Sequence, residues 1–491
     1  MNPTCPAVRV AIALLGCTPS AFAQLPNYTA APGTTVLNTV FTQITTSAGP
    51  MNVADGVFVF NQVTIPVGSV VVGSGSRPMI WVVNTMTIDG HLSADGKDGM
   101  RVQTIGSANF PVLGGLPGPA GGLGGAGSPR STTQSFQGQA GYGPGNVAGA
   151  GGGGGSLALL AGSERGSGGG GGAFGTQGDP WFRTPAGTGT AFVQRLGVGG
   201  FGGLGASGSA TRTLLGGAPA LTPFGDGRPD NDFFGLGYDV ASQQFVVGEL
   251  SGLLGGSGGG GGGDASNDNI VLSPNFVQDD QGGGGGGGGG CLVVYALQTI
   301  VVGPGGKVTA NGGHGGGGGL AGSNTRGGGG GGGAGGLLIL AAHGGIDLHV
   351  KGETYANADY DFVLSADGGV TTTGFFSPPL VTGKYPANGL PTVAANVYDS
   401  APLGGFGGLG VVQLVTPAGV GNADGTNTIL DDNIRLFRNG LPLLGAQKQR
   451  YLAWRGFANA NGVRVDDSGT PIVIGNAEGD IRPTPHLLPL F

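Results

Sequence analysis

Acidic side chains are the residues of this chain whose types and spacing could support catalysis. Enzymes that cleave polysaccharides use two or three carboxylates held at a defined separation. The chain supplies adjacent pairs and one short cluster of aspartates: Asp279 and Asp280, Asp431 and Asp432, Asp466 and Asp467, and Asp226, Asp230 and Asp232. All of them stand in turn-like sequence, where aspartate is common because its side chain hydrogen-bonds the neighbouring backbone. We therefore assign no catalytic residue.

Oxygen-bearing side chains also gather in residues 263–269, where they could bind calcium. A calcium ion takes six or more oxygen ligands from a tight, acidic loop. The candidate ligands are Asp264, Asn267, Asp268 and Asn269. The tandem nonapeptide repeats of secreted calcium-binding proteins are represented only by isolated fragments. Calcium is the one cofactor that the sequence suggests, and turns capped by Asp and Asn are the alternative interpretation.

Three histidines and one cysteine are the other candidates for metal binding or nucleophilic chemistry. His314, His343 and His349 fall in related repeats, but His343 lies at a turn and His349 in an alternating strand. We expect exposed or stacked rings there rather than a metal site. Cys291 begins an apolar stretch without a nearby His and acid, so we expect a small buried side chain.

Aromatic side chains are few and stand beside glycines, in segments typical of loop tips. Exposed rings at such tips could stack on sugars, whereas buried rings would cover the edge of a packed glycine layer. The ligand-binding candidates are Trp181, Phe182, Phe233 and Phe234, and the pair Phe375 and Phe376 has a similar setting. Both interpretations stay open.

Glycine dominates the segments that must position these side chains. The chain has 491 residues, of which 115 are glycine, and only 10% are charged. Ordinary globular proteins contain about 7% glycine and about 25% charged residues. Apolar stretches such as 79–83 and 291–295 nevertheless recur and could form a core. The net charge of −7, with scattered Lys and Arg, argues against nucleic acid or anionic lipid as a partner.

The N-terminal residues resemble an export signal. Arg9 is followed by a short apolar run, 10–16, and by a small-x-small cleavage site at Ala21-Phe22-Ala23. Cleavage there removes residues 1–23. The alternative is a lipobox at 14–17, which would leave Cys17 as the lipid-modified N-terminus of a periplasmic or outer-membrane lipoprotein. No later apolar run reaches the roughly 20 residues of a transmembrane helix, so we expect none.

Short apolar segments recur along the chain in groups of three. Each group contains three short strands separated by Gly, Asn, Asp or Pro turns, without helical periodicity. The groups occupy residues 81–96, 292–312 and 337–357, and a degraded copy lies at 411–437. Units of about 20 residues with three strands are typical of the coils of a parallel β-helix. The sequence therefore predicts an all-β fold, a right-handed parallel β-helix or solenoid.

A polar residue is expected at the corner after the third strand of each group. Asp95, Asn311 and Asn357 hold this position in the three groups. Asn and Asp tolerate left-handed backbone conformations, and their side chains can form ladders between stacked repeats.

These segments resemble a group of secreted bacterial glycine-rich β-helix proteins. The resemblance rests on residues 55–60, 63–68 and 86–90 and on the Ala-Asn-Gly-Gly-His-Gly unit at 310–315. It covers roughly 55–99 and 282–357. The resemblance implies a β-helix fold and secretion, and it implies no established activity.

Runs of glycine interrupt and join the repeats. The longest is 282–290, and others lie within 121–127, 151–155, 168–172 and 258–263. Such runs can pair as three-fold extended helices, whose backbones approach closely because no side chain intervenes. We expect a polyglycine II bundle docked against the β-helix, with flexible loops as the alternative.

The chain is thereby divided into consecutive regions. They are a signal peptide (1–23), N-terminal β-helix coils and cap (24–99), a glycine-rich insertion (100–281), β-helix repeats with glycine-rich loops (282–440), and a C-terminal cap and tail (441–491).

The function that fits these regions is a secreted or cell-surface structural or adhesive protein without catalytic activity. Its expected partners are a surface glycan or other copies of itself. One alternative is a polysaccharide lyase or glycosidase on the same solenoid. The other is a glycan- or receptor-binding adhesin that uses the loop-tip aromatics.

Overall fold

A computed structural model of the protein is described here for residues 24–102, 112–129, 137–149, 151–152, 168–175, 233–239, 244–263, 281–321, 325–350, 363–369, 404–405, 407–416, 433–442, 454–455, 457–460 and 463–465. Within these residues the chain is all-β, as predicted: no α-helix occurs, and a 3-10 turn, η1, spans Pro144–Asn146. None of the described segments forms a helix capable of crossing a membrane.

The N-terminal region contributes strands β1 (Tyr28–Thr29), β2 (Gly33–Asn38), β3 (Phe41–Thr46), β4 (Gly49–Ala54), β5 (Val57–Ile65), β6 (Ser69–Ser74), β7 (Met79–Ile88) and β8 (His91–Ser93). The later repeats contribute β13 (Cys291–Ala296), β14 (Thr299–Val302), β15 (Lys307–Thr309), β18 (Leu337–Ala342), β19 (Gly345–His349), β20 (Leu364–Ser365), β21 (Val411–Val415), β22 (Ile434–Arg438), β24 (Trp454–Arg455) and β25 (Phe457–Ala460). Shorter strands are β9 (Tyr142–Gly143), β10 (Val147–Ala148), β11 (Leu236–Asp239), β12 (Gln244–Val247), β16 (Leu320–Ala321), β17 (Thr325–Arg326), β23 (Leu441–Pro442) and β26 (Val463–Val465).

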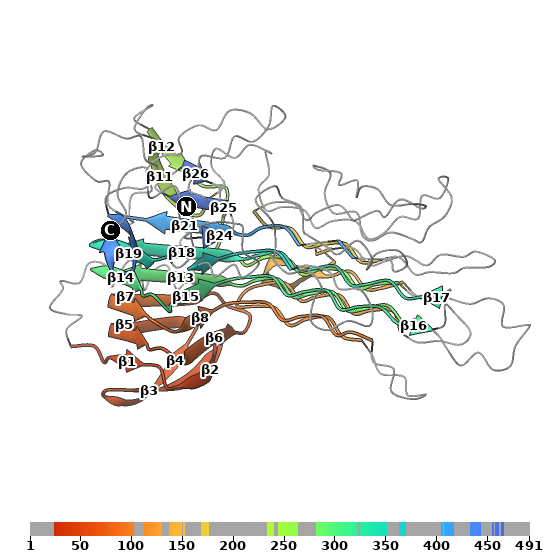
Figure 1. Ribbon diagram of the computed structural model, residues 1–491, viewed down its shortest axis with the longest axis horizontal. Helices are drawn as coiled ribbons and strands as arrows, with labels where there is room; N and C mark the ends of the chain where they lie inside the picture. The colour runs from red at the N-terminus through yellow and green to blue at the C-terminus, as the bar shows by residue number, and fades with distance from the viewer. Residues whose placement is uncertain are drawn as a thin grey trace, which may run out of the picture.

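Strands of successive repeats pair in parallel and form three rows (Figure 1). In the first row, the first half of β7 pairs with β13, followed by β18, β21 and β25. In the second row, the second half of β7 pairs with β14, followed by β19 and β22. The third row contains β2, β6, β8, β15, β20 and β24. The repeats that contain β13 and β18 therefore lie next to each other, in parallel.

Strand β7 joins the first two rows into one sheet. Met79 is paired with Leu292 of β13, and Met86 with Ile300 of β14, so one long strand serves both rows. In the described residues this gives a 12-stranded sheet that curls around the core. The sheet is mixed rather than purely parallel, because β23 pairs antiparallel with β22 and β26 antiparallel with β25.

Equivalent apolar side chains stack in columns through the core. One column is Trp81, Val294, Leu340 and Leu414, which are paired in register and fully buried. The Trp81 ring also stacks on Phe58, with ring centroids 4.7 Å apart. These columns remove apolar surface from water repeat by repeat, which is the main stabilising term in such a stack.

The first row is buried on both of its faces. Ile80, Val293 and Ile339 point away from the main core and pack with Phe174 and Leu250 of the glycine-rich region. A sheet covered on both faces has continuous apolar strands rather than alternating ones. This explains the unbroken runs at 79–83 and 291–294.

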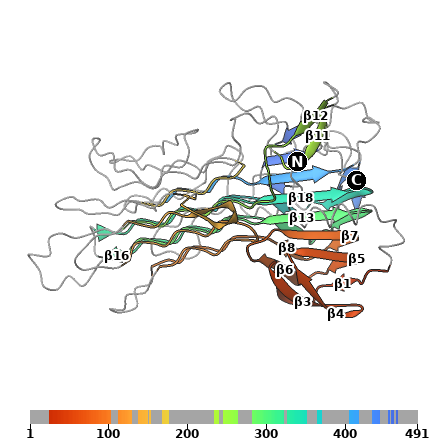
Figure 2. The ribbon, with the colours of Figure 1, turned by 180° about the vertical axis from the view of Figure 1, so that it is seen from behind.

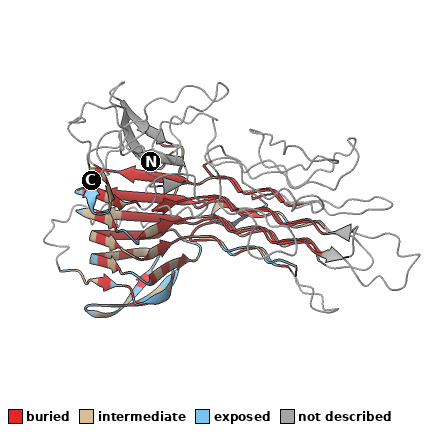
Figure 3. Ribbon diagram, viewed as in Figure 1, coloured by how far each residue is buried: buried red, intermediate tan, exposed pale blue. Residues whose placement is uncertain are grey.

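The glycine-rich segments extend from one end of these strands as an elongated arm, which is largely buried (Figures 1 and 3). Segment 282–290 is central to the arm, and its backbone N–H groups donate in three directions, with N···O distances of 2.7–2.9 Å. Every third N–H group donates to the same neighbouring segment. Residues 283, 286 and 289 donate to the carbonyls of 328, 331 and 334, and residues 284, 287 and 290 donate to those of 100, 97 and 94. Residues 285 and 288 donate to the carbonyls of 125 and 122. A β-strand would instead donate alternately to two neighbours.

At the central glycines of the arm, backbone packing leaves no space for a side chain. A Cβ atom added at Gly284, Gly285 or Gly286 would overlap the carbonyl oxygen of Leu113, Gly259 or Gly313, respectively. Glycine is therefore required by contact between backbones, since none of these three residues has a positive φ angle.

An antiparallel hairpin, β3–β4, lies across the N-terminal end of the stack (Figure 1). Its Ile44 and Val53 side chains are buried in the main core, while most of its other residues are exposed or half-buried. At the C-terminal end, the described parts of 441–491 are β23 to β26.

One predicted strand position was wrong. The third strand of the repeat that contains β18 was expected at 354–357, with Asn357 at the corner. The strand that pairs with β15 is β20, and Asp367 follows it. Residue 357 lies outside the described residues.

Substituting Gly286 by Ala should lower the free energy of unfolding by about 2–4 kcal/mol, because the added Cβ would force backbones apart. The matched control is Gly252→Ala, where the nearest atom to an added Cβ is Leu254 Cγ at 4.0 Å. The control should change stability by less than about 1 kcal/mol. Denaturant unfolding measures both variants, and equal stabilities would contradict the close packing of the arm.

Candidate functional site

A connected group of polar side chains lies at the corner after the third row. Asp95 Oδ1 accepts a hydrogen bond from the Asn311 backbone N–H at 2.6 Å. In the next repeat, Asn311 Oδ1 accepts from the Asp367 backbone N–H at 2.8 Å. The side chains of Asp95 and Asn311 thus each bind the corner backbone of the following repeat. We call Asp95, Asn311 and Asp367 the corner column.

Hydroxyl side chains two residues before each corner reinforce the column. Thr309 donates to Asp95 Oδ2 at 2.9 Å, and Ser365 donates to Asn311 Oδ1 at 2.5 Å. In each of these two bonds, the hydroxyl and its acceptor belong to neighbouring repeats, so the bond connects one repeat to the next. This network recurs because the same order of residue types recurs. A small hydroxyl residue, Ala, an Asp or Asn, and Gly follow one another at 93–96, 309–312 and 365–368.

His91 extends this network from β8. Its Nε2 atom lies 2.7 Å from Thr309 Oγ1. A hydroxyl has one proton, and Thr309 gives it to Asp95, so Nε2 of His91 is the donor in this contact. A base that activates a nucleophile must accept the hydroxyl proton instead. The arrangement therefore stabilises the stack and does not prepare Thr309 for attack.

Burial lowers the pKa of His91 below its ordinary value. Desolvation is the main cause, the Asp95 carboxylate opposes it, and the positive charges of Lys307 and Lys97 add to it. The neutral ring is thus favoured in the folded protein.

The aromatic candidates have different outcomes. Phe233 is fully buried and packs with Ala341 and Val415, so its ring offers no surface to a sugar in this structure. Phe234 is half-buried, and its backbone is held by the Gln413 side chain, which accepts from the Phe234 N–H at 3.2 Å and donates to its carbonyl at 2.8 Å. Trp181 and Phe182 lie outside the described residues.

The acidic and calcium candidates also lie outside the described residues. This applies to every aspartate pair and to the cluster considered above, and to Asp264, Asn267, Asp268 and Asn269. Among the residues that are described, no group of three or more His, Cys, Asp or Glu side chains is arranged to hold a metal ion.

The histidines and the cysteine lie in separate environments. The His349 ring stacks on Phe437 of the paired strand, with ring centroids 4.9 Å apart, while the His314 backbone N–H donates to Asp98 Oδ1 at 2.8 Å. Cys291 is a buried free thiol, as predicted, and burial raises its pKa well above the ordinary value. A buried thiol with a raised pKa is a poor nucleophile.

Sequence reasoning found part of the corner column and missed the rest. Asp95 and Asn311 were expected at corners, whereas Asp367 and the hydroxyl partners were not. The missing signal was the pentapeptide Leu-Ser-Ala-Asp-Gly, which occurs identically at 92–96 and 364–368.

Comparison with known proteins adds no relationship: the chain matches no protein-family model, no curated protein and no solved structure.

Acidification should destabilise the protein through His91. Because the pKa of His91 is lowered in the folded state, the unfolded chain binds the proton first, and stability falls as the pH drops through about 6.5. His91→Gln keeps a nitrogen donor for Thr309 but cannot titrate, so its stability should not show this part of the decrease at low pH. Thermal unfolding of both proteins between about pH 8 and pH 5 checks the prediction. Identical pH dependence of the two midpoints would contradict it.

Proposed function

We propose that this chain is an exported structural or adhesive protein of the bacterial cell surface or extracellular matrix, which does not act as an enzyme. Its body is a right-handed parallel β-helix, and its arm is a bundle of polyglycine II helices. The arm holds its far end, which includes hairpin β16–β17, at a fixed distance from the body (Figure 1).

The β-helix is supported by the three rows of parallel strands. Each repeat adds one strand to each row, as Leu292, Ile300 and Val308 illustrate for a single repeat. All three side chains are buried in the same core. A stack of coils with one shared core is the architecture of a solenoid.

The three-residue period of the backbone hydrogen bonds in the arm is the observation that supports the proposal. It is the period of a polyglycine or polyproline II helix. At about 3.1 Å per residue, a segment of nine residues such as 282–290 is about 28 Å long. Hairpin β16–β17 lies at the end of the arm remote from β13 and β18 in both views (Figures 1 and 2).

A bundle of this kind suits a mechanical or display role. Backbone bonds in three directions cross-link every segment to its neighbours, so the arm resists bending and holds its far end in place. The interior of the arm is mostly glycine backbone, and its few buried side chains are small, such as Ser128, Ser257 and Ala334. Binding groups must therefore lie at the far end of the arm or on its outer layer.

Export is supported by the sequence of residues 1–23. Secretion should leave Gln24 as the N-terminus of the mature protein, found outside the cell or on its surface. Replacing Ala23 with Phe should block cleavage, because the peptidase requires a small residue there. N-terminal sequencing and mass determination of the fractionated protein check this.

The control for export is Cys17→Ser, which should leave processing unchanged. If Cys17→Ser blocks processing and Ala23→Phe does not, the protein is a lipoprotein and the proposed cleavage site is wrong.

An adhesive protein should bind a cell-surface polysaccharide without degrading it. Replacing Trp181 and Phe182 together with Ala should weaken binding of the purified protein by about tenfold or more, because each stacked ring contributes about 1 kcal/mol. The matched control replaces Phe375 and Phe376. Binding is measured by sedimentation with isolated cell-wall polysaccharide, together with an assay for released sugar ends. Release of sugar would favour the enzyme alternative, and unchanged binding by both variants would remove these rings from the adhesive surface.

A further inference from the structure

Strand β2 is the outermost strand of the third row at the N-terminal end. It pairs with β6 along one edge, and no described strand pairs with its other edge. The Gly33 and Thr39 N–H groups donate toward Gly68 and Ser74. Backbone groups of successive residues in a strand point to opposite edges, so those of Thr34, Val36 and Asn38 point away from β6.

The surface around this edge is exposed and apolar. Val36 is 59% exposed, and Val40 and Phe41, which follow the strand, are 45% and 58% exposed. Figure 3 shows exposed residues concentrated at this end of the stack.

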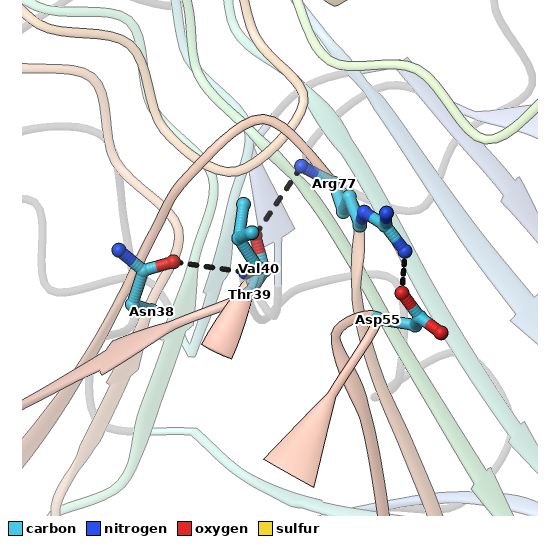
Figure 4. A network of polar contacts seen from close by, with 5 residues as sticks. All are labelled: Asn38, Thr39, Val40, Asp55 and Arg77. Atoms are coloured by element: carbon cyan, nitrogen blue, oxygen red, sulfur yellow. Dashed lines mark hydrogen bonds and ion pairs between the residues drawn. The ribbon is translucent and has the colours of Figure 1, made fainter. Parts of the chain in front are cut away.

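No charged residue protects the edge. Residues 24–54 contain no Asp, Glu, Lys, Arg or His, and Asp55 is the first charged residue of this region. Asp55 forms an ion pair with Arg77 beside the β2–β3 turn, so these two charges compensate each other (Figure 4). Proteins that keep an edge strand unpaired usually place charges, especially Lys, or Pro within it. Strand β2 has neither.

The turn after β2 fixes the strand in its extended form. Asn38 Oδ1 accepts from the Val40 N–H at 2.8 Å, and Thr39 Oγ1 accepts from the Arg77 N–H at 3.3 Å (Figure 4). The edge is therefore already shaped for pairing, which lowers the entropy cost of binding.

We propose that β2 pairs antiparallel with β2 of a second copy of this chain, about a two-fold axis through Val36. This register places the two Val36 residues opposite each other, and Thr34 of each copy opposite Asn38 of the other. All three residues present their backbone groups to the partner, which gives about six hydrogen bonds. Apolar Val36 thus faces apolar Val36, and the uncharged polar Thr34 and Asn38 face each other, so the surface is self-complementary.

We favour a second copy over a charged partner because this end carries no net charge: residues 24–54 have no charged side chain, and Asp55 and Arg77 compensate each other. Over the rest of the surface, the net charge of −7 opposes contact between copies. The two third rows would become one continuous sheet across the dimer. This pairing does not depend on the proposed adhesive role.

Analytical ultracentrifugation of the purified protein tests the proposal. The native protein should sediment as a dimer. Val36→Lys should raise the dimer dissociation constant at least about tenfold, since two like charges would meet at the axis. Val36→Pro should act similarly, because it removes an N–H that faces only the partner. The matched control is Val67→Lys, at an exposed valine on the turn before β6, which should remain dimeric.

A charge-swap experiment separates loss of pairing from loss of folding. Val36→Asp alone should also be monomeric, and an equimolar mixture of the Val36→Lys and Val36→Asp proteins should recover the dimer. A monomeric native protein, dimeric Val36 variants, or a mixture that stays monomeric would each overturn the proposal. Pairing of β2 with a different protein in place of a second copy would overturn it as well.

Discussion

Direct contact between backbones is the constraint on which the rest of this structure depends. In the arm, nearly every direction around a segment is occupied by another backbone, and a single added Cβ at Gly286 would overlap a carbonyl oxygen. Ordering a glycine costs about 1–2 kcal/mol of conformational entropy, whereas one hydrogen bond returns about 1 kcal/mol on balance. A lone glycine segment is therefore not expected to be ordered. Each segment needs neighbours that accept its N–H groups in several directions, so the arm forms as a whole.

The sheet supplies the alignment that glycine cannot. Segments 282–290 and 327–336 run directly into β13 and β18, and the Leu337 N–H donates to the Gly290 carbonyl at 3.0 Å across the junction. In the sheet, Cys291 is paired with Leu337 and Leu337 with Val411. Burial of the leucines and valines fixes this register, since a slip by one residue would turn each side chain to the opposite face. The same register continues into the arm, where glycines alone would have no reason to prefer one alignment over another.

The sequence predicted what side-chain patterns encode and failed where those patterns are absent. The all-β fold and the adjacent β13 and β18 repeats followed from apolar segments with Gly and Asn turns. The third strand of the β18 repeat was misplaced, because residues between β19 and β20 lengthen this repeat and only a short strand, Leu364–Ser365, marks its end. The partners of each glycine were unpredictable, since a residue without a side chain carries no pattern. Phe233 resembled a loop tip because it stands near glycines, yet its ring is fully buried, against Ala341, Val415 and Gly248, which is distant in sequence.

The corner column lies where the two packing modes meet, and this position explains its residue types. In the third row, backbone groups bond alternately to two neighbouring strands. Beyond residue 95 they bond in three directions, and Gly96 and Gly99 donate to the carbonyls of Asn311 and His314. At the change of period, backbone N–H groups of the corner are left without a carbonyl, and a buried N–H without a partner is costly. The Asp95 and Asn311 side chains accept these N–H groups. A short acceptor at these two corners therefore lets the chain pass from a strand into a glycine-rich segment without a break in the hydrogen bonding.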